Sequence, residues 1–306
     1  LIPDNSYAPN QSLAVSELQN FGITHQRYDP LNVNDLAARI NSKTRLVWLE
    51  AAGSVTMEFP DLVAQVALCK SRGILCALDN TWGAGLAFNA FDLTPGHARE
   101  PLGVDLTIHA LTKYPSGGGD VLMGSIITRS DSLARTIKLS HMRLGTGVGA
   151  NDVETILRAL PTLDMRYAAQ DQSARELAQW CLNQAVFAQV LHPALPTSPG
   201  HLHWQKLCVN TQYPQGRSAG IFSVVIADQF SAAQADAFCD ALRIFKIGYS
   251  WGGPMSLVVP YQKNNIRTLP APHLKSGTVV RFCLGFEDVE DLKADIEQAI
   301  GKAFTS

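Results

Sequence analysis

Residues 74–82 read Ile-Leu-Cys-Ala-Leu-Asp-Asn-Thr-Trp, an apolar run that ends in an acid, Asp79. Residues 104–114 read Val-Asp-Leu-Thr-Ile-His-Ala-Leu-Thr-Lys-Tyr, and Lys113 follows this second apolar run. A third run, residues 45–50, is separated from the first by a helical pattern over residues 61–71. Strand, helix and strand joined by short connections predict a mostly parallel sheet covered on both faces, which is an α/β fold.

The rest of the first half continues this alternation. Hydrophobic periodicity predicts strands at residues 23–28, 45–50, 74–78, 104–109 and 121–128, and helices at residues 10–20, 34–40, 61–71, 132–142 and 152–160. Asn10 is a candidate N-cap for the first helix and Gly22 its stop, while Asn151 with Glu154 resembles a capping box.

The second half has a different, α+β pattern. Helices are expected at residues 166–184, 232–242 and 289–304, and strands at residues 220–227, 245–249, 256–259 and 279–285. Pro193, Pro196 and Pro199 mark a loop. Pro161 can interrupt a helix, so we expect a domain boundary there, with domains at residues 1–160 and 161–306.

Composition narrows the class of protein. The 306 residues are 46% hydrophobic and 17% charged, which indicates a globular chain and excludes disorder as its main state. A net charge of −2 offers no basic face to nucleic acid, and no apolar run is long enough to span a membrane. The six cysteines form no CxxC pair, which argues against a disulfide framework or zinc site and favours the reducing cytoplasm.

Asp79 and Lys113 each follow an expected strand, and ligands in open α/β sheets bind beyond the carboxyl ends of the strands. Either residue alone is more simply explained as a capping acid or a surface lysine. Together they fit one chemistry, because a lysine can form a Schiff base with pyridoxal phosphate and an acid can pair with its pyridine nitrogen. The sequence therefore indicates a pyridoxal-phosphate site at this edge of the sheet.

Several ordered motifs resemble those of the Cys/Met-metabolism family of pyridoxal-phosphate enzymes, and the resemblance covers nearly the whole chain. The motifs are Tyr7, residues 50–58, residues 79–82, residues 112–114, Asp120 with Val121 and Gly124, residues 249–253, and Arg281. Three features look most like the bacterial cystathionine β-lyase branch: the Tyr-Ser-Trp-Gly-Gly stretch at residues 249–253, the serine at position 54, and Asp-Asn-Thr-Trp at residues 79–82. Ala110 stands where many members have a phosphate-binding serine.

The resemblance implies the aspartate-aminotransferase-like fold, fold type I. It has a large pyridoxal-phosphate domain, residues 1–160, and a smaller α+β domain, residues 161–306. In this reading Lys113 holds the cofactor and moves the Cα proton, Asp79 pairs with the pyridinium, and Thr112 binds the phosphate. Tyr7 stacks on the ring and takes part in catalysis.

The same resemblance assigns the substrate side of the pocket. Arg281 clamps the α-carboxylate of an amino acid, a task that suits its planar guanidinium. Ser250 lies beside that carboxylate, and Trp251 and Tyr249 contribute to the pocket. A strand residue facing water remains an alternative for Arg281, a packed aromatic residue for Tyr7 and a turn serine for Ser250.

The implied reaction is α,β-elimination of L-cystathionine to homocysteine, pyruvate and ammonia, a carbon–sulfur lyase step of transsulfuration and methionine biosynthesis. The alternatives are a γ-lyase, a γ-synthase, a sulfhydrylase or a truncated non-catalytic homologue. The family's phosphate-cradling loop and its arm to the neighbouring subunit precede the tyrosine matched by Tyr7, so the large domain is expected to be incomplete. The family suggests a cytoplasmic homotetramer, a dimer of dimers.

Two motifs are not assigned a function. Residues 145–149, Gly-Thr-Gly-Val-Gly, follow a helical pattern and lack dinucleotide-loop spacing, so they predict a flexible connection. His201 and His203 lie in a Pro/Gly-rich stretch without a third ligand nearby, so we expect solvent-facing histidines and no metal.

Overall fold

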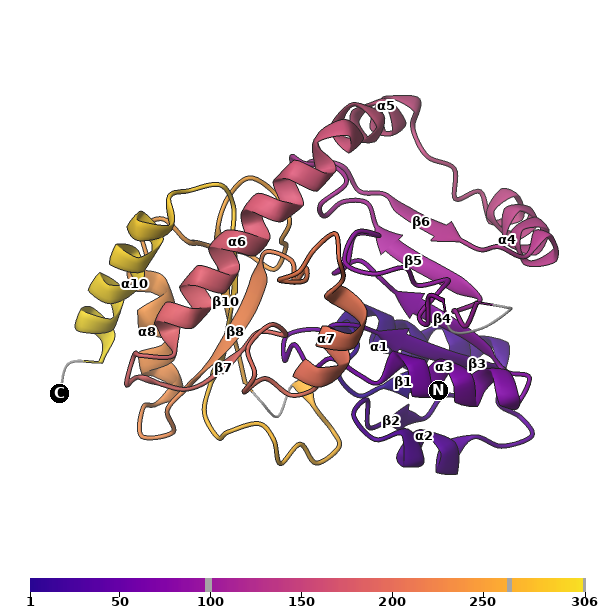
Figure 1. The fold of residues 1–306 in the computed structure, drawn as a ribbon, viewed down its shortest axis with the longest axis horizontal. Coiled ribbons are helices and arrows are strands. Elements are labelled where there is room, and N and C mark those ends of the chain that lie inside the picture. Colours follow the sequence, from indigo (N-terminus) through magenta and orange to yellow (C-terminus); the bar gives the residue numbers. More distant parts are fainter. Residues whose placement is uncertain (97–100, 263–265, 305–306) are drawn as a thin grey trace.

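The computed structural model describes residues 1–96, 101–262 and 266–304. Two sheets lie side by side, and α6 runs along the second sheet toward the end of the first, as Figure 1 shows. The first sheet has four strands in the order β3-β4-β5-β6, and the second has five in the order β7-β8-β11-β10-β9. A two-stranded pair, β1-β2, lies beside the first sheet.

The first sheet confirms the α/β expectation. Its strands are β3 (Leu46–Glu50), β4 (Leu75–Asp79), β5 (Leu106–Ala110) and β6 (Gly124–Ile127). The first three are parallel, and Glu50 pairs in register with Asp79. The fourth is antiparallel to β5, because only turns connect the two strands, and a parallel pair needs a long crossover.

Side-chain capping determines where the helix between β3 and β4 begins. α3 (Leu62–Ser71) begins where the Asp61 side chain accepts a hydrogen bond from the Ala64 backbone. It buries Leu62, Val66 and Cys69 against the core and is followed by Gly73, whose φ is 62°. This agrees with the predicted helix at residues 61–71.

The N-terminal segment differs from its prediction. The helix expected at residues 10–20 is α1 (Ala8–Ser16) followed by a 3-10 turn, η1 (Leu18–Phe21). Its N-cap is Tyr7 rather than Asn10, because Pro9 has the fixed φ that suits a first helical turn. The strand expected at 23–28 is only β2 (Arg27–Tyr28), which pairs with β1 (Ile2–Pro3), and α2 (Val33–Arg39) follows.

Three helices connect the two sheets. They are α4 (Asp131–Leu144), α5 (Ala150–Ala159) and α6 (Leu163–Cys181), with a 3-10 turn, η2 (Leu160–Thr162), at Pro161. The capping box expected at Asn151 and Glu154 is wrong. The helix begins at Ala150 with Gly149 as its N-cap, so Asn151 already lies within its first turn.

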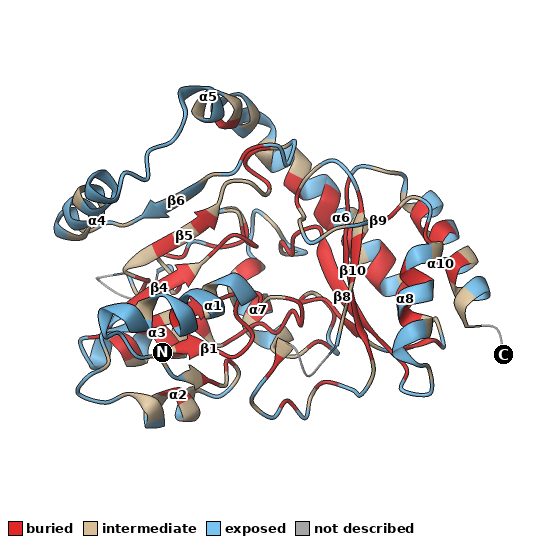
Figure 2. Cartoon of the chain, turned by 180° about the vertical axis from the view of Figure 1, so that it is seen from behind, coloured by how far each residue is buried: buried red, intermediate tan, exposed pale blue. Residues whose placement is uncertain are grey.

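The second sheet has the α+β pattern that was predicted. Its strands are β7 (Phe187–Leu191), β8 (Ile221–Ile226), β9 (Lys246–Ile247), β10 (Leu257–Tyr261) and β11 (Val279–Cys283). α8 (Ala232–Ala241), α10 (Val289–Ala303) and α6 pack around it, and Figure 2 shows their buried residues turned toward the strands. No helix in the described part of the chain is long and apolar enough to cross a membrane.

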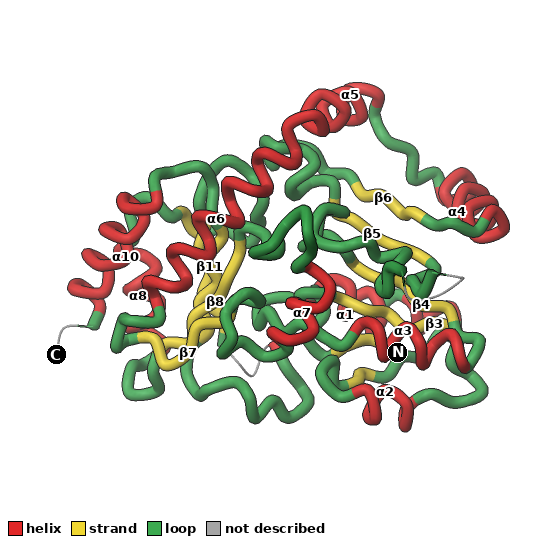
Figure 3. Tube along the Cα trace, viewed as in Figure 1, coloured by secondary structure: helices red, strands yellow, loops and turns green. Residues whose placement is uncertain are grey.

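Two elements of this half were not predicted, β7 and α7 (His201–Cys208), and the loop over residues 192–200 connects them (Figure 3). The histidines expected to face solvent in a loop are therefore helical. His201 Nδ1 lies 2.9 Å from the carbonyl oxygen of Pro193, and His203 Nδ1 lies 3.6 Å from an Asp61 carboxylate oxygen.

Candidate active site

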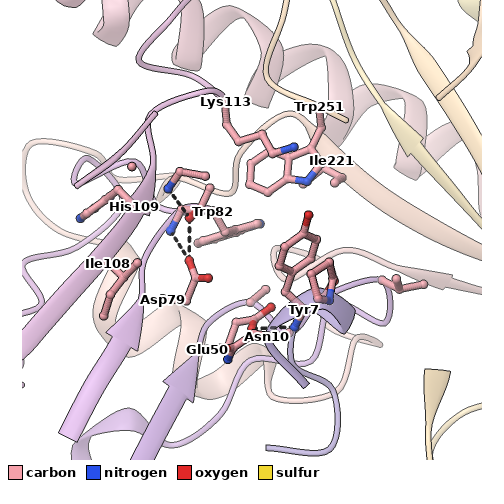
Figure 4. Close-up of a pocket in the computed structure, with 18 of the residues that line it drawn as sticks. Tyr7, Asn10, Glu50, Asp79, Trp82, Ile108, His109, Lys113, Ile221 and Trp251 are labelled. Atoms are coloured by element: carbon pink, nitrogen blue, oxygen red, sulfur yellow. Dashed lines mark hydrogen bonds between the residues drawn. The ribbon is translucent and has the colours of Figure 1, made fainter. Parts of the chain in front are cut away.

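A cavity of about 410 Å³ lies at the carboxyl ends of β3, β4 and β5. Ile221 and Arg281 of the second sheet and Trp251 of the β9–β10 loop close it, and Tyr7 enters from the start of α1 (Figure 4). A cavity at this edge of a parallel sheet is the usual ligand site of an open α/β fold.

Asp79 is the acid at the end of β4. Its Oδ1 accepts hydrogen bonds from the Thr81 backbone at 3.0 Å and the Thr81 hydroxyl at 2.6 Å. The Thr81 oxygen in turn accepts the Ala110 backbone N–H at 2.9 Å, so strand β5 holds this acid in place. Burial raises the pKa of Asp79, and the bonds from Thr81 oppose that rise. A cation at the second carboxylate oxygen would favour the charged form.

Lys113 reaches the cavity from the turn after β5. Its Nζ lies 3.0 Å from the Ser250 hydroxyl and 5.3 Å from the centre of the Trp251 ring. No carboxylate forms an ion pair with it among the residues the structure describes. Burial, and then the positive charge of Arg281, lower the pKa of Lys113. A lysine with a lowered pKa can act as a nucleophile or a base near neutral pH.

Arg281 lies in the centre of β11 but is only 6% exposed, so the structure does not support a strand residue facing water. Its Nη2 donates to the Tyr249 carbonyl oxygen at 2.5 Å, and its guanidinium lies 5.4 Å from the centre of the Tyr261 ring. Within the described ranges, Arg281 has no acidic partner. A buried guanidinium without a counter-ion is suited to a carboxylate ligand.

The remaining predicted site residues divide into two groups. Tyr7, Ser250 and Trp251 lie at the cavity: Tyr7 and Trp251 line it, and Ser250 contacts Lys113. Thr112 and Tyr249 are not among the lining residues. The Thr112 hydroxyl is bonded to the backbone of Met123, and Tyr249 is 74% exposed and contributes its carbonyl oxygen instead.

The sequence did not single out Glu50 as a site residue, although it lines the cavity. Its Oε2 accepts the Tyr7 backbone N–H at 2.9 Å. Burial, and then the nearby Asp79, raise the pKa of Glu50 well above its ordinary value. The signal was present, because Glu50 ends an apolar strand just as Asp79 does.

Residues 1–301 match the model of the Cys/Met metabolism PLP-dependent enzymes. The chain belongs to this family. Its cofactor is pyridoxal phosphate, and it is a cystathionine β-lyase-like enzyme.

Relatives in the Cys/Met-metabolism family align over almost the whole chain. A Rhizobium johnstonii protein, whose name provisionally assigns it to the cystathionine β-lyases, is 37% identical over 99% of this chain and 72% of its own length. The cystathionine β-lyase of Escherichia coli is 31% identical over 99% of this chain and 73% of its own. An L-alanine/L-glutamate racemase of Wolbachia pipientis is 32% identical over 99% of this chain and 70% of its own.

Solved structures support the fold expected for this family. The cystathionine γ-lyase of Lactobacillus plantarum superposes with a TM-score of 0.85 at 19% identity, over 100% of this chain and 76% of that one. The metB protein of Corynebacterium glutamicum superposes with a TM-score of 0.83 at 24% identity, over 98% of this chain and 74% of that one. Fold type I is therefore confirmed.

The cavity fits the family's cofactor. Among the described residues, the side-chain hydrogen bonds to Asp79 go to one oxygen, which leaves the other for a pyridinium, and the aromatic residues Tyr7 and Trp82 line the same cavity. Lys113 has an amine that no acid neutralises among the described residues. Pyridoxal phosphate bound here would supply an electron sink for a substrate amino acid.

Proposed function

We propose that this enzyme is a carbon–sulfur lyase that converts L-cystathionine to homocysteine, pyruvate and ammonia. One observation carries the proposal: a single cavity holds Lys113, Arg281 and Asp79. Among the described residues, the amine and the guanidinium have no acidic partner, and one Asp79 carboxylate oxygen accepts no hydrogen bond. These groups suit, in turn, a Cα proton, a substrate carboxylate and a pyridinium.

Each of these residues has a defined task in the proposed reaction. Arg281 binds the α-carboxylate and orients the amino acid. Lys113, with its lowered pKa, removes the Cα proton at Nζ, and Ser250 holds that amine by a hydrogen bond. The Cβ–S bond then breaks, the sulfur keeps both bond electrons and takes up a proton from the Lys113 Nζ, and homocysteine leaves as the thiol. Addition of water to the remaining three-carbon unit gives pyruvate and ammonia. Tyr7 covers one side of the cavity, and Thr112 remains a candidate phosphate ligand.

The names of the relatives support this reaction. The Escherichia coli and Salmonella typhimurium proteins are named cystathionine β-lyases, and the Dictyostelium discoideum protein is named a cystathionine γ-lyase. The β-elimination reaction is therefore the first to test, and γ-elimination is the alternative within the family.

The test begins with the visible absorption of the purified chain after incubation with pyridoxal phosphate, with Lys113→Ala alongside. We expect a band in the wild type that the variant lacks, followed by release of pyruvate from cystathionine. Release of 2-oxobutyrate would assign γ-elimination instead. A folded wild type without a band would contradict the proposal and favour a non-catalytic homologue.

A second candidate, amino-acid racemisation, rests on the racemase among the relatives and on the site itself. Lys113 and Tyr7 approach the cavity from different elements (Figure 4). Racemisation needs proton transfer on two faces of Cα, and these two groups could provide it. Incubation of the loaded enzyme with L-alanine, followed by chiral analysis, tests this candidate directly.

We also infer a homo-oligomer, as in the family, with the pyridoxal-phosphate domain at residues 1–160 and the smaller domain at 161–306. No residue of α4 is buried, and β6 has a free edge, which supports a covering subunit. Light scattering of the purified chain tests the assembly. All six cysteines are buried and unpaired, which supports a cytoplasmic location.

A further inference from the structure

Glu50 lies where the first sheet meets the start of α1. It is the last residue of β3, pairs in register with Asp79 on β4, and is 7% exposed. Its side chain lines the cavity, so it is buried by the site rather than by the hydrophobic core alone. Two carboxyl groups therefore end adjacent parallel strands at the place where the cofactor is expected.

The Glu50 carboxyl makes a specific contact with Tyr7. Its Oε2 accepts the Tyr7 backbone N–H at 2.9 Å, and the Tyr7 carbonyl oxygen accepts N–H groups from Asn10 and Gln11 in the first turn of α1. Tyr7 is the N-cap residue, with a φ of −49° and a ψ of 125°, so its own N–H lies outside the helical ladder. Glu50 thus joins the start of α1 to the end of β3.

Packing alone holds the Tyr7 side chain weakly, since this side chain is 50% exposed. The residues before it are anchored to the same loop: the Asn5 amide donates to Glu58 at 2.8 Å, and the Ser54 N–H donates to the Asn5 carbonyl oxygen at 2.9 Å. The hydrogen bond to Glu50 anchors the next part of this segment, at Tyr7, whose ring lines the cavity.

We propose that Glu50 is a positioning residue, whose carboxyl fixes the Tyr7 backbone next to Asp79 and so sets where the Tyr7 ring covers the cofactor. This inference rests on the proposed function, because it assigns a role in the same site. The role needs an acceptor oxygen at Oε2 and does not need a negative charge.

The surroundings of Glu50 favour a neutral acceptor. No cation forms an ion pair with it within the described part of the chain, and its charged neighbour is another carboxyl group, Asp79. The other titratable group that faces it is Tyr28 of β2, whose hydroxyl donates to the Trp48 carbonyl oxygen. Burial, and then the charge of Asp79, raise the pKa of Glu50, and hydrogen bonds from the backbone N–H groups of Tyr7 and Ser54 lower it by less. Burial without a counter-ion therefore favours the protonated carboxylic acid, which accepts the Tyr7 N–H as an amide oxygen would.

The test compares Glu50→Ala with Glu50→Gln. Selective 15N-tyrosine labelling reports seven backbone amides, and Tyr7→Phe assigns the Tyr7 signal. We expect faster hydrogen exchange at the Tyr7 amide in Glu50→Ala and wild-type exchange in Glu50→Gln. This measurement needs no cofactor.

Cofactor affinity and turnover provide the second readout. We expect Glu50→Ala to weaken pyridoxal-phosphate binding about five- to tenfold, the order expected for one hydrogen bond, and to change the circular dichroism of the visible band. Glu50→Gln should restore both. Gln65→Ala is the matched control, because Gln65 is also buried and donates to the Pro30 carbonyl oxygen at 2.8 Å, and it does not line the cavity.

Unchanged Tyr7 exchange in Glu50→Ala would overturn the inference. So would a Glu50→Gln variant as impaired as Glu50→Ala, because the site would then need a charge. If Gln65→Ala changed the dichroism equally, the effect would come from lost stability and the positioning role would fall. If the wild type bound no cofactor, the proposed function would fail, and the role of Glu50 in positioning Tyr7 over the cofactor would fail too. The hydrogen-exchange data would still show whether Glu50 holds the Tyr7 backbone.

Discussion

Lys113 and Ser250 meet at the junction of the two sheets, with Nζ 3.0 Å from Oγ. Lys113 follows β5 of the first sheet, and Ser250 lies between β9 and β10 of the second. Gly252 tightens the same junction, because a Cβ there would lie 2.8 Å from the Tyr114 backbone nitrogen. The second sheet therefore helps to place the amine that the first sheet delivers.

Replacement of Lys113 by alanine should abolish the visible cofactor band and reduce turnover by about 10²–10⁴-fold, the range for a lost general base. The fold should remain, because Lys113 has no ion pair among the described residues. Absorption spectra and pyruvate release measure the two effects. Lys70→Ala, which removes an exposed lysine paired with Asp105, should retain the band.

Replacement of Ser250 by alanine should reduce kcat by roughly fivefold, the equivalent of one hydrogen bond of about 1 kcal/mol. The reason is that the Lys113 amine loses its fixed partner and adopts more orientations. Steady-state kinetics with cystathionine measure this change. A Ser250→Ala enzyme with wild-type kcat would show that Trp251 alone orients the amine, and Ser132→Ala on the surface of α4 serves as the control.

Replacement of Arg281 by lysine should raise KM at least tenfold, because an ammonium cannot bind a carboxylate through two parallel hydrogen bonds. The buried guanidinium also donates to the Tyr249 carbonyl oxygen, so some loss of stability is expected. Kinetics and urea unfolding separate the two effects. A fall in kcat at constant KM would contradict carboxylate binding by Arg281.

The sequence predicts the positions of Asp79 and Lys113 after strands more accurately than it predicts where helices and strands begin and end. Asp79 and Lys113 follow strands, as expected, because charged residues at strand ends are easy to recognise next to apolar runs. The start of α1 was misplaced, since Pro9 sets the first turn and moves the N-cap to Tyr7. Helix α7 was missed, because it has only eight residues and follows a proline-rich loop.

The side-chain partners depend on contacts that sequence spacing cannot supply. Thr112 is adjacent to Lys113 in sequence, yet its hydroxyl is bonded to the Met123 backbone. Glu50 acquires its partner Tyr7 through a contact across 43 residues. Neither result follows from hydrophobic periodicity, because both depend on how turns direct individual side chains.

The pH dependence of stability tests the raised pKa of Glu50. Above the ordinary glutamate pKa of about 4.3, the folded chain keeps a proton on Glu50 that the unfolded chain releases, so stability falls as the pH rises. Glu50→Gln lacks this titration. We expect it to unfold at higher urea than wild type near pH 7.5, with the gap between the two proteins closing toward pH 4. A gap that is constant with pH would exclude a raised Glu50 pKa.

Replacement of Gly53 by alanine should disturb the chain just before Tyr7, at Asn5. A Cβ at Gly53 would overlap the Asn5 side-chain amide, which is bonded to Glu58. Overpacking of this kind costs about 1–3 kcal/mol, so we expect a lower unfolding midpoint and weaker cofactor binding. Gly147→Ala is the matched control, because no atom lies within 4 Å of its added Cβ.

The double variant Asn5→Ala with Gly53→Ala shows whether the overlap itself causes the loss. Removing the Asn5 amide leaves room for the new Cβ, so part of the stability lost in Gly53→Ala should return, and the two substitutions should be non-additive. Urea unfolding of the four proteins in this cycle measures the coupling. Strict additivity would mean that Gly53 is required for its own backbone, whereas recovery would show that Asn5 and Gly53 together fix the chain that carries Tyr7.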